Sequence, residues 1–79
     1  MISAYILIDM KPGNFDNAIE AMRKIENITK ISVVAGEYDI IVRVQVTSLD
    51  KLLIVTNKLQ MIDGVNNTTT QIIEKELAL

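Results

Sequence analysis

Hydrophobic and polar residues alternate along the start of the chain. From Ile2 to Asp9 every second side chain is apolar and falls on one face, a pattern typical of a half-buried β-strand. A second alternating run, from Tyr38 to Val46, places four branched apolar side chains on one face. Two further segments are rich in β-branched residues, which favour strands. The sequence therefore predicts four strands, at residues 2–9, 28–35, 38–46 and 65–76.

Two segments between these strands repeat apolar residues at helical spacing. The first begins after Asn14, a residue type that commonly caps helices, and carries a polar face opposite its apolar stripe. The second begins after Ser48, which we expect to cap it, and ends at Asp63-Gly64 because Gly is preferred just past a helix. The apolar positions are Phe15, Ala18, Ile19, Met22 and Ile25 in the first helix, and Leu49, Leu52, Leu53, Val55, Leu59 and Ile62 in the second.

The elements follow in the order βαββαβ, so we expect one α+β domain over residues 1–79. Two helices on one face of a four-stranded antiparallel sheet form the ferredoxin-like sandwich, with strand order 4-1-3-2. The other face of the sheet carries Tyr5, Leu7 and Ile41, which a single copy leaves uncovered. A second sheet packed face to face would bury them. We therefore expect a homodimer built sheet to sheet, as in a dimeric α+β barrel.

Composition supports self-association. A domain of 79 residues buries only about 60–65% of its extended-chain surface and is marginal alone. The chain has no Cys to form disulfides, while 49% of its residues are hydrophobic. Oligomerisation is the remaining common source of stability in so small a domain. No apolar run approaches the ~18 residues of a membrane span, so we expect a cytoplasmic protein without membrane contact.

Charge and residue types exclude several classes of function. The net charge is −2 and the eight Lys and Arg residues form no run, whereas nucleic-acid binders of this size normally carry a basic face. Direct binding to DNA or RNA is therefore not expected. With no His and no Cys, the chain offers no zinc site and no Ser-His or Cys-His catalysis. We expect no metal and no cofactor.

The joint between the second and third strands is a candidate binding site. Gly36 can adopt a positive φ without a Cβ clash, which suits a hairpin turn. Tyr38 and Asp39 follow at the mouth of the third strand, where a phenol, a carboxylate and backbone amides could hold a small polar molecule. The alternative is structural: Tyr38 packs and Asp39 stabilises the turn, as Asp commonly does.

The start of the last strand is a second candidate. Six consecutive polar residues, 66–71, place hydroxyl and amide groups on both faces of the strand. Hydrogen bonds from such groups suit an amino-acid-like ligand. Because Thr favours strands, a plain solvent-facing edge is the alternative interpretation.

Two motifs together give the chain a family resemblance. They are Val34-x-Gly36-x-Tyr38-Asp39-Ile40-x-Val42-x-Val44 and, after a Leu-rich helix, Ile62-Asp63-Gly64-Val65-x-x-Thr68-x-Thr70-x-Ile72. This pattern, which covers essentially the whole chain, resembles the effector domain of the leucine-responsive/asparagine-type (Lrp/AsnC) transcription regulators. That domain is also called the regulator of amino-acid metabolism (RAM) module.

The resemblance implies a function and a site. Family members carry an N-terminal helix-turn-helix; this sequence begins at the first strand, so we expect a stand-alone effector and oligomerisation module. Family modules pair through their sheets and assemble into rings, commonly octamers, with an amino-acid effector bound between dimers. By position, the ligand-binding residues would be Gly36, Tyr38, Asp39, Thr68 and Thr70. We infer that the Asp39 carboxylate pairs with the ligand ammonium group and that backbone amides near Gly36 bind the ligand carboxylate. The hydroxyls of the two Thr residues would form hydrogen bonds with the remaining polar atoms of the ligand.

The sequence departs from the family pattern at two positions, and two other functions stay open. Asp63 and Asn67 stand where the family often has Pro and a basic residue, so the effector need not be acidic. One alternative is a ligand-free assembly module that co-assembles with full-length Lrp/AsnC regulators. The other is a dimeric α+β barrel enzyme, disfavoured by an inner face of Ile, Val and Leu and by the absence of His; we expect no enzymatic activity and no catalytic residues.

Overall fold

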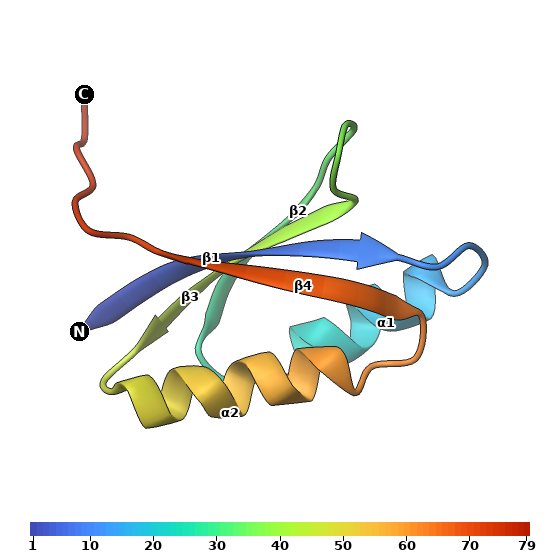
Figure 1. Ribbon diagram of the computed structural model, residues 1–79, viewed down its shortest axis with the longest axis horizontal. Helices are drawn as coiled ribbons and strands as arrows, with labels where there is room; N and C mark the ends of the chain where they lie inside the picture. Colours follow the sequence, from blue (N-terminus) through green and yellow to red (C-terminus); the bar gives the residue numbers. More distant parts are fainter.

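The computed structural model describes all 79 residues, and its elements follow the predicted order βαββαβ (Figure 1). The strands are β1 (Ile2–Met10), β2 (Ile28–Val33), β3 (Ile40–Val46) and β4 (Val65–Ile72), and the helices are α1 (Phe15–Arg23) and α2 (Leu49–Gln60).

The four strands form one antiparallel sheet in the order β2-β3-β1-β4. The two central strands are β1 and β3, and Ile6 of β1 pairs with Val42 of β3 on one side and with Thr70 of β4 on the other. The predicted strand order 4-1-3-2 is therefore confirmed. It brings the first and last strands of the chain side by side.

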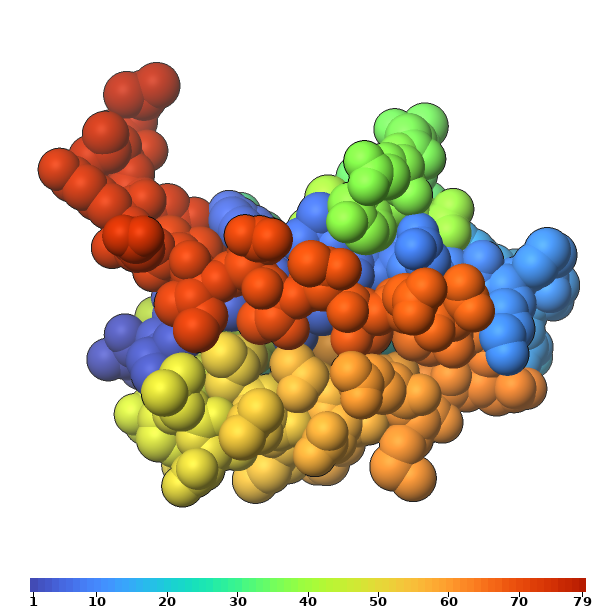
Figure 2. Space-filling view, viewed as in Figure 1, coloured from blue at the N-terminus to red at the C-terminus, as the bar shows by residue number.

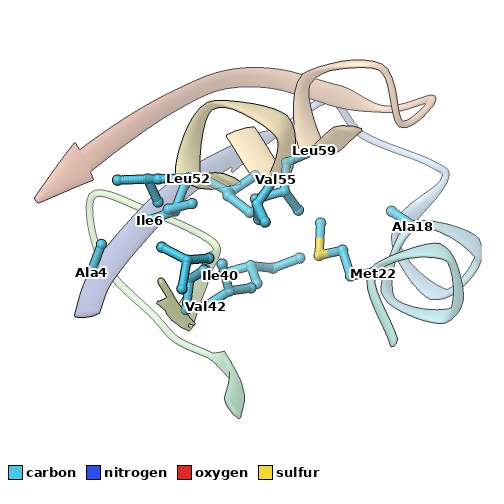
Figure 3. Close-up of a cluster of buried hydrophobic side chains, with 12 residues drawn as sticks. Ala4, Ile6, Ala18, Met22, Ile40, Val42, Leu52, Val55 and Leu59 are labelled. Carbon is cyan, nitrogen blue, oxygen red and sulfur yellow. The ribbon is translucent and has the colours of Figure 1, made fainter. Parts of the chain in front are cut away.

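A core of twelve buried apolar residues fills the space between the sheet and the helices (Figure 3). Alternate residues of the central strands point into it, Ile6 and Val42 among them, and Met22 of α1 and Leu59 of α2 complete it from the helices. Burying a side chain of this size contributes roughly 1.5–3 kcal/mol. The two-residue period of the strands and the 3.6-residue period of the helices thus converge on one core.

The other face of the sheet has no helix over it, because both helices lie on the same side (Figure 1). We call it the open face and define it by Tyr5, Leu7, Ile41, Arg43 and Gln71, which are register partners on neighbouring strands. Four of them, all except Arg43, line a shallow groove of about 340 Å³. The prediction that the helices leave Tyr5, Leu7 and Ile41 uncovered is confirmed.

Two segments rise on the side of the open face (Figure 2). The loop between β2 and β3, residues 34–39, stands at one end of the sheet, and the C-terminal tail, residues 73–79, stands at the other. We call them the hairpin loop and the tail. The open face lies between these two raised segments.

Three strands are shorter than predicted. The second strand ends at Val33 rather than Ala35, and the third begins at Ile40 rather than Tyr38, because Gly36 adopts φ +142° and the chain leaves the plane of the sheet in the hairpin loop. The last strand ends at Ile72 rather than Glu76. Its neighbour β1 begins at Ile2, so after the bond from the Ile73 N–H to the Ser3 carbonyl little of β1 remains to pair with.

The helix ends also refine the prediction. Ser48 caps α2 as predicted, since its Oγ accepts a hydrogen bond from the Lys51 N–H at 3.3 Å. Asn14 stands at the N-cap of α1, but its side chain makes no capping bond. Its Nδ2 instead donates to Oδ2 of Asp63 at 2.8 Å, which ties the start of α1 to the turn after α2.

Candidate functional site

The hairpin loop owes its shape to Gly36. At φ +142° this residue lies in a region that L side chains rarely adopt, although a Cβ there would meet no atom within 4 Å. The requirement for Gly is therefore one of backbone conformation and not of space. The turn predicted at Gly36 is present, and its backbone is exposed to solvent.

Asp39 fastens the hairpin loop to the end of β1. Its Oδ2 accepts a hydrogen bond from the Met10 N–H at 2.8 Å, and its own N–H donates to the Ile8 carbonyl at 3.0 Å. Its carbonyl accepts from the Val34 N–H at 3.0 Å. The Met10 bond falls where β1 changes register against β4, between Asp9 and Met10. Asp39 thus stabilises the turn, which was the structural one of the two interpretations of this residue.

Tyr38 precedes Asp39 and is half-buried at the base of the hairpin loop. It is the neighbour of Asp39 along the chain. Gly36, Tyr38 and Asp39 consequently form one group on one short loop, as the sequence predicted.

Thr68 and Thr70 form a second group on the edge strand β4. They pair with Ile8 and Ile6, whose side chains are buried under the helices, and residues paired across strands share a face. Thr68 is already engaged, because its Oγ1 accepts a hydrogen bond from Nε2 of Gln60 on α2 at 3.0 Å. Thr70 is exposed.

The two groups flank the same point of β1 without meeting. Asp39 bonds to the backbone of Ile8 on one side, and Thr68 pairs with Ile8 on the other. Two strand spacings, about 10 Å, therefore separate their backbones. The hairpin loop rises over the open face (Figure 2), whereas the Thr side chains are on the helix side. One chain by itself does not gather all five predicted residues around a single pocket.

A polar cluster on the open face was not predicted. Tyr5 and Arg43 are direct register partners on β1 and β3, and both bind Glu76 of the tail. Nη2 of Arg43 donates to Oε1 at 2.7 Å, and the Tyr5 hydroxyl donates to Oε2 at 2.9 Å. The alternation placed Tyr5 and Arg43 on the same face, but nothing in the sequence shows that the tail folds back over it.

This cluster has the clearest electrostatic consequences in the molecule. The hydrogen bond from Arg43, followed by that from Tyr5, holds the pKa of the Glu76 carboxyl below its ordinary value. The same contact with Glu76 raises the pKa of the Arg43 guanidinium. Both groups are therefore held in their charged forms.

No three His, Cys, Asp or Glu side chains gather closely enough to hold a metal ion. Neither helix has the length and apolar character needed to cross a membrane.

Comparison with known proteins identifies the family. The model of the Lrp/AsnC ligand binding domain matches residues 3–78. The chain belongs to the Lrp/AsnC family. The resemblance read from the Gly-x-Tyr-Asp and Gly-Val-x-x-Thr-x-Thr motifs is thereby confirmed.

Solved structures share the fold over most or all of the chain. The crystal structure of FFRP-DM1 is 30% identical, with a TM-score of 0.84, over 92% of this chain and 99% of that one. The feast or famine regulatory protein Rv3291c from M. tuberculosis, solved with L-methionine, is 25% identical, with a TM-score of 0.86, over 100% of this chain and 54% of that one.

Among curated Lrp/AsnC relatives, the HTH-type transcriptional regulator FL11 of Pyrococcus furiosus is 28% identical over 74 residues, or 94% of this chain. The match spans 49% of the length of that regulator. This chain therefore corresponds to about half of that regulator.

Proposed function

We propose that this Lrp/AsnC domain is a non-enzymatic sensor of a small amino acid in transcription regulation. The observation that carries the proposal is the match of residues 3–78 to a ligand-binding domain. A relative of the same fold, Rv3291c, was solved in complex with L-methionine. An amino acid is therefore the class of ligand to test first.

The geometry supports a site in which Asp39 meets the ligand ammonium. One carboxylate oxygen, Oδ2, is held by Met10, so the side chain is fixed in direction and Oδ1 is the oxygen that would receive the ligand. A fixed acceptor loses little conformational freedom on binding. The exposed amides around Gly36 would bind the ligand carboxylate. The Tyr38 side chain would form one wall of the site.

Thr68 and Thr70 would have to reach the ligand from another copy. In one chain they lie about two strand spacings, ~10 Å, from Asp39 and on the helix side of the sheet. A ligand bound at the hairpin loop could meet them only where copies adjoin. The proposed site is thus completed by assembly, and its occupancy would be coupled to the oligomeric state.

The proposed assembly begins with a pair of copies joined through their open faces. The apolar groove formed by Tyr5, Leu7, Ile41 and Gln71 has no cover in one chain. Packing two such faces about 10 Å apart is a standard arrangement of sheets. Larger rings, such as the predicted octamer, would then be built from these pairs.

A second candidate function is assembly without a ligand, in which the domain joins full-length regulators of the family. Its support is the apolar surface of α2, where Leu53 and Ile54 are more than half exposed at 59% and 52%. Burying such a patch against a related domain would be favourable.

Thermal melting with each of the twenty amino acids tests the first function, with light scattering in parallel. A ligand that binds only the folded protein raises the melting temperature. Asp39→Asn should remove the response, because it removes the charge but keeps an oxygen for the Met10 N–H. Asp16→Asn, on an exposed helix turn, is the matched control. A response that survives in Asp39→Asn would place the ligand elsewhere, and no response to any amino acid would favour the assembly function.

A further inference from the structure

The open face contains a preformed receptor for a carboxylate. Its two donors, the Tyr5 hydroxyl and the Arg43 guanidinium, stand opposite each other on the two central strands of the sheet. Each carboxylate oxygen of Glu76 accepts one of these bonds, at 2.7 and 2.9 Å. The Oγ1 of Thr29 on β2 lies 3.5 Å from the other Nη of Arg43. Both donors therefore project from strands of the sheet.

The acceptor, by contrast, comes from a segment without regular structure. After Ile73 donates its N–H to the Ser3 carbonyl, the tail forms no further strand or helix. Glu76 makes the side-chain hydrogen bonds between the tail and the sheet. Leu77 and Leu79 beyond it remain exposed, at 71% and 119%.

Glu76 changes the charge of the open face. By strand register the sheet places two cations, Lys30 and Arg43, and one carboxylate, Asp9, on this face. The Glu76 carboxylate, delivered by the tail, lies 2.7 Å from Arg43 and supplies its countercharge. An Arg43 that is paired in this way can approach a second copy without an uncompensated charge.

Burial makes the pairing of Arg43 with Glu76 important. Arg43 stands next to Tyr5 and near the apolar groove, and its side chain is 19% exposed. A second sheet packed onto the face would remove much of its remaining water. A charge that loses water must be paired, or association is strongly disfavoured.

We propose that Glu76 neutralises Arg43 so that the open face can pair with the open face of a second copy. The proposal rests on the sheet-to-sheet pairing proposed above and assigns a residue to it. Tyr5 and Arg43 supply the donors, Glu76 the countercharge, and Leu7 and Ile41 the apolar contact. In this arrangement the tail forms part of the sheet-to-sheet interface.

Self-association of matched variants tests the proposal. Dissociation constants would be measured by sedimentation over a dilution series. Glu76→Gln keeps the shape and removes the charge, and it should weaken pairing roughly tenfold or more, as truncation of one partner of a buried charge pair does. Glu74→Gln, on the same tail, should pair as the unmodified chain does. Adding Arg43→Met to Glu76→Gln removes both charges and should restore pairing.

The outcomes separate this proposal from the pairing on which it rests. Leu7→Glu places a charge in the apolar groove and should abolish pairing through the open face. If Leu7→Glu abolishes pairing but Glu76→Gln leaves it unchanged, the pairing stands and the role of Glu76 is refuted. Tighter pairing of Glu76→Gln would show that the tail covers the face instead, and would also refute it. If the unmodified chain stays monomeric, or Leu7→Glu pairs normally, the sheet-to-sheet arrangement itself is refuted.

Discussion

The Asp39 carboxylate is hydrogen-bonded to the Met10 N–H at 2.8 Å, across 29 positions of sequence. This bond joins the hairpin loop to the end of β1, at the point where β1 changes register against β4. The residue proposed to bind a ligand ammonium therefore also holds its own loop in place. Its two roles can be separated by substitution.

Asp39→Ala should destabilise the fold, because it leaves the partly buried Met10 N–H without its partner. Hydrogen bonds to charged groups contribute about 1.5–3 kcal/mol, and we expect a loss near the lower end of this range. Asp39→Asn should lose less, since its amide oxygen can still accept. Urea denaturation of both variants measures the difference, and equal losses would show that the bond to Met10 contributes little.

Thr70→Val should weaken amino-acid binding while leaving the fold intact. Thr70 is exposed on an edge strand, and Val favours strands as Thr does. Loss of one hydrogen bond, about 1 kcal/mol, corresponds to roughly a fivefold rise in the dissociation constant. Thr47→Val, in the exposed turn before α2, is the control. Titration calorimetry with the amino acid found by melting would compare them, and an unchanged affinity in Thr70→Val would remove Thr70 from the site.

Gly64→Ala should destabilise the turn before β4. Gly64 adopts φ +96°, and an added Cβ would lie 3.2 Å from Asn14 Cβ and from Met10 Cε. Backbone strain and crowding together should cost about 1–2 kcal/mol of the free energy of unfolding.

Asn27 occupies the equivalent position before β2, with φ +76°, so Asn27→Gly should be neutral or slightly stabilising. Thermal melting of the two variants should show shifts of different size or sign, and similar shifts would contradict this account.

The Glu76 cluster should make stability depend on pH in the acid range. Arg43, and then Tyr5, lower the pKa of Glu76 from its ordinary value of 4.5, with Lys30 adding to the effect. A lowered pKa means that the contribution is present above about pH 4.5 and is lost as pH falls through the folded-state value. Because Glu76 is 46% exposed, the effect should be small and should shrink in high salt.

Denaturation at pH 7 and pH 3, with and without salt, checks this dependence against Glu76→Gln. The difference in unfolding free energy between the unmodified chain and the variant should narrow at pH 3. A constant difference would mean that the ion pair does not contribute to stability.

The candidate site was predictable only in part. Gly36, Tyr38 and Asp39 are neighbours in sequence, so a single turn brings them together and the motif alone located them. Thr68 and Thr70 come to the other side of β1 through strand order and register, which are long-range properties. That they point to the helix side, away from the hairpin loop, follows from their pairing with Ile8 and Ile6.

The sequence by itself determined the elements, their order and the buried stripe of each, because these follow from the period of apolar residues along the chain. Only the tertiary structure decided that Tyr5 and Arg43 face each other and that Glu76 leaves the predicted strand to bind them. Local periodicity determines on which face of the sheet a side chain lies. It does not determine which charged residue from a distant part of the chain will pair with that side chain. That choice depends on where β1 begins, since the last strand stops where its neighbour can no longer pair.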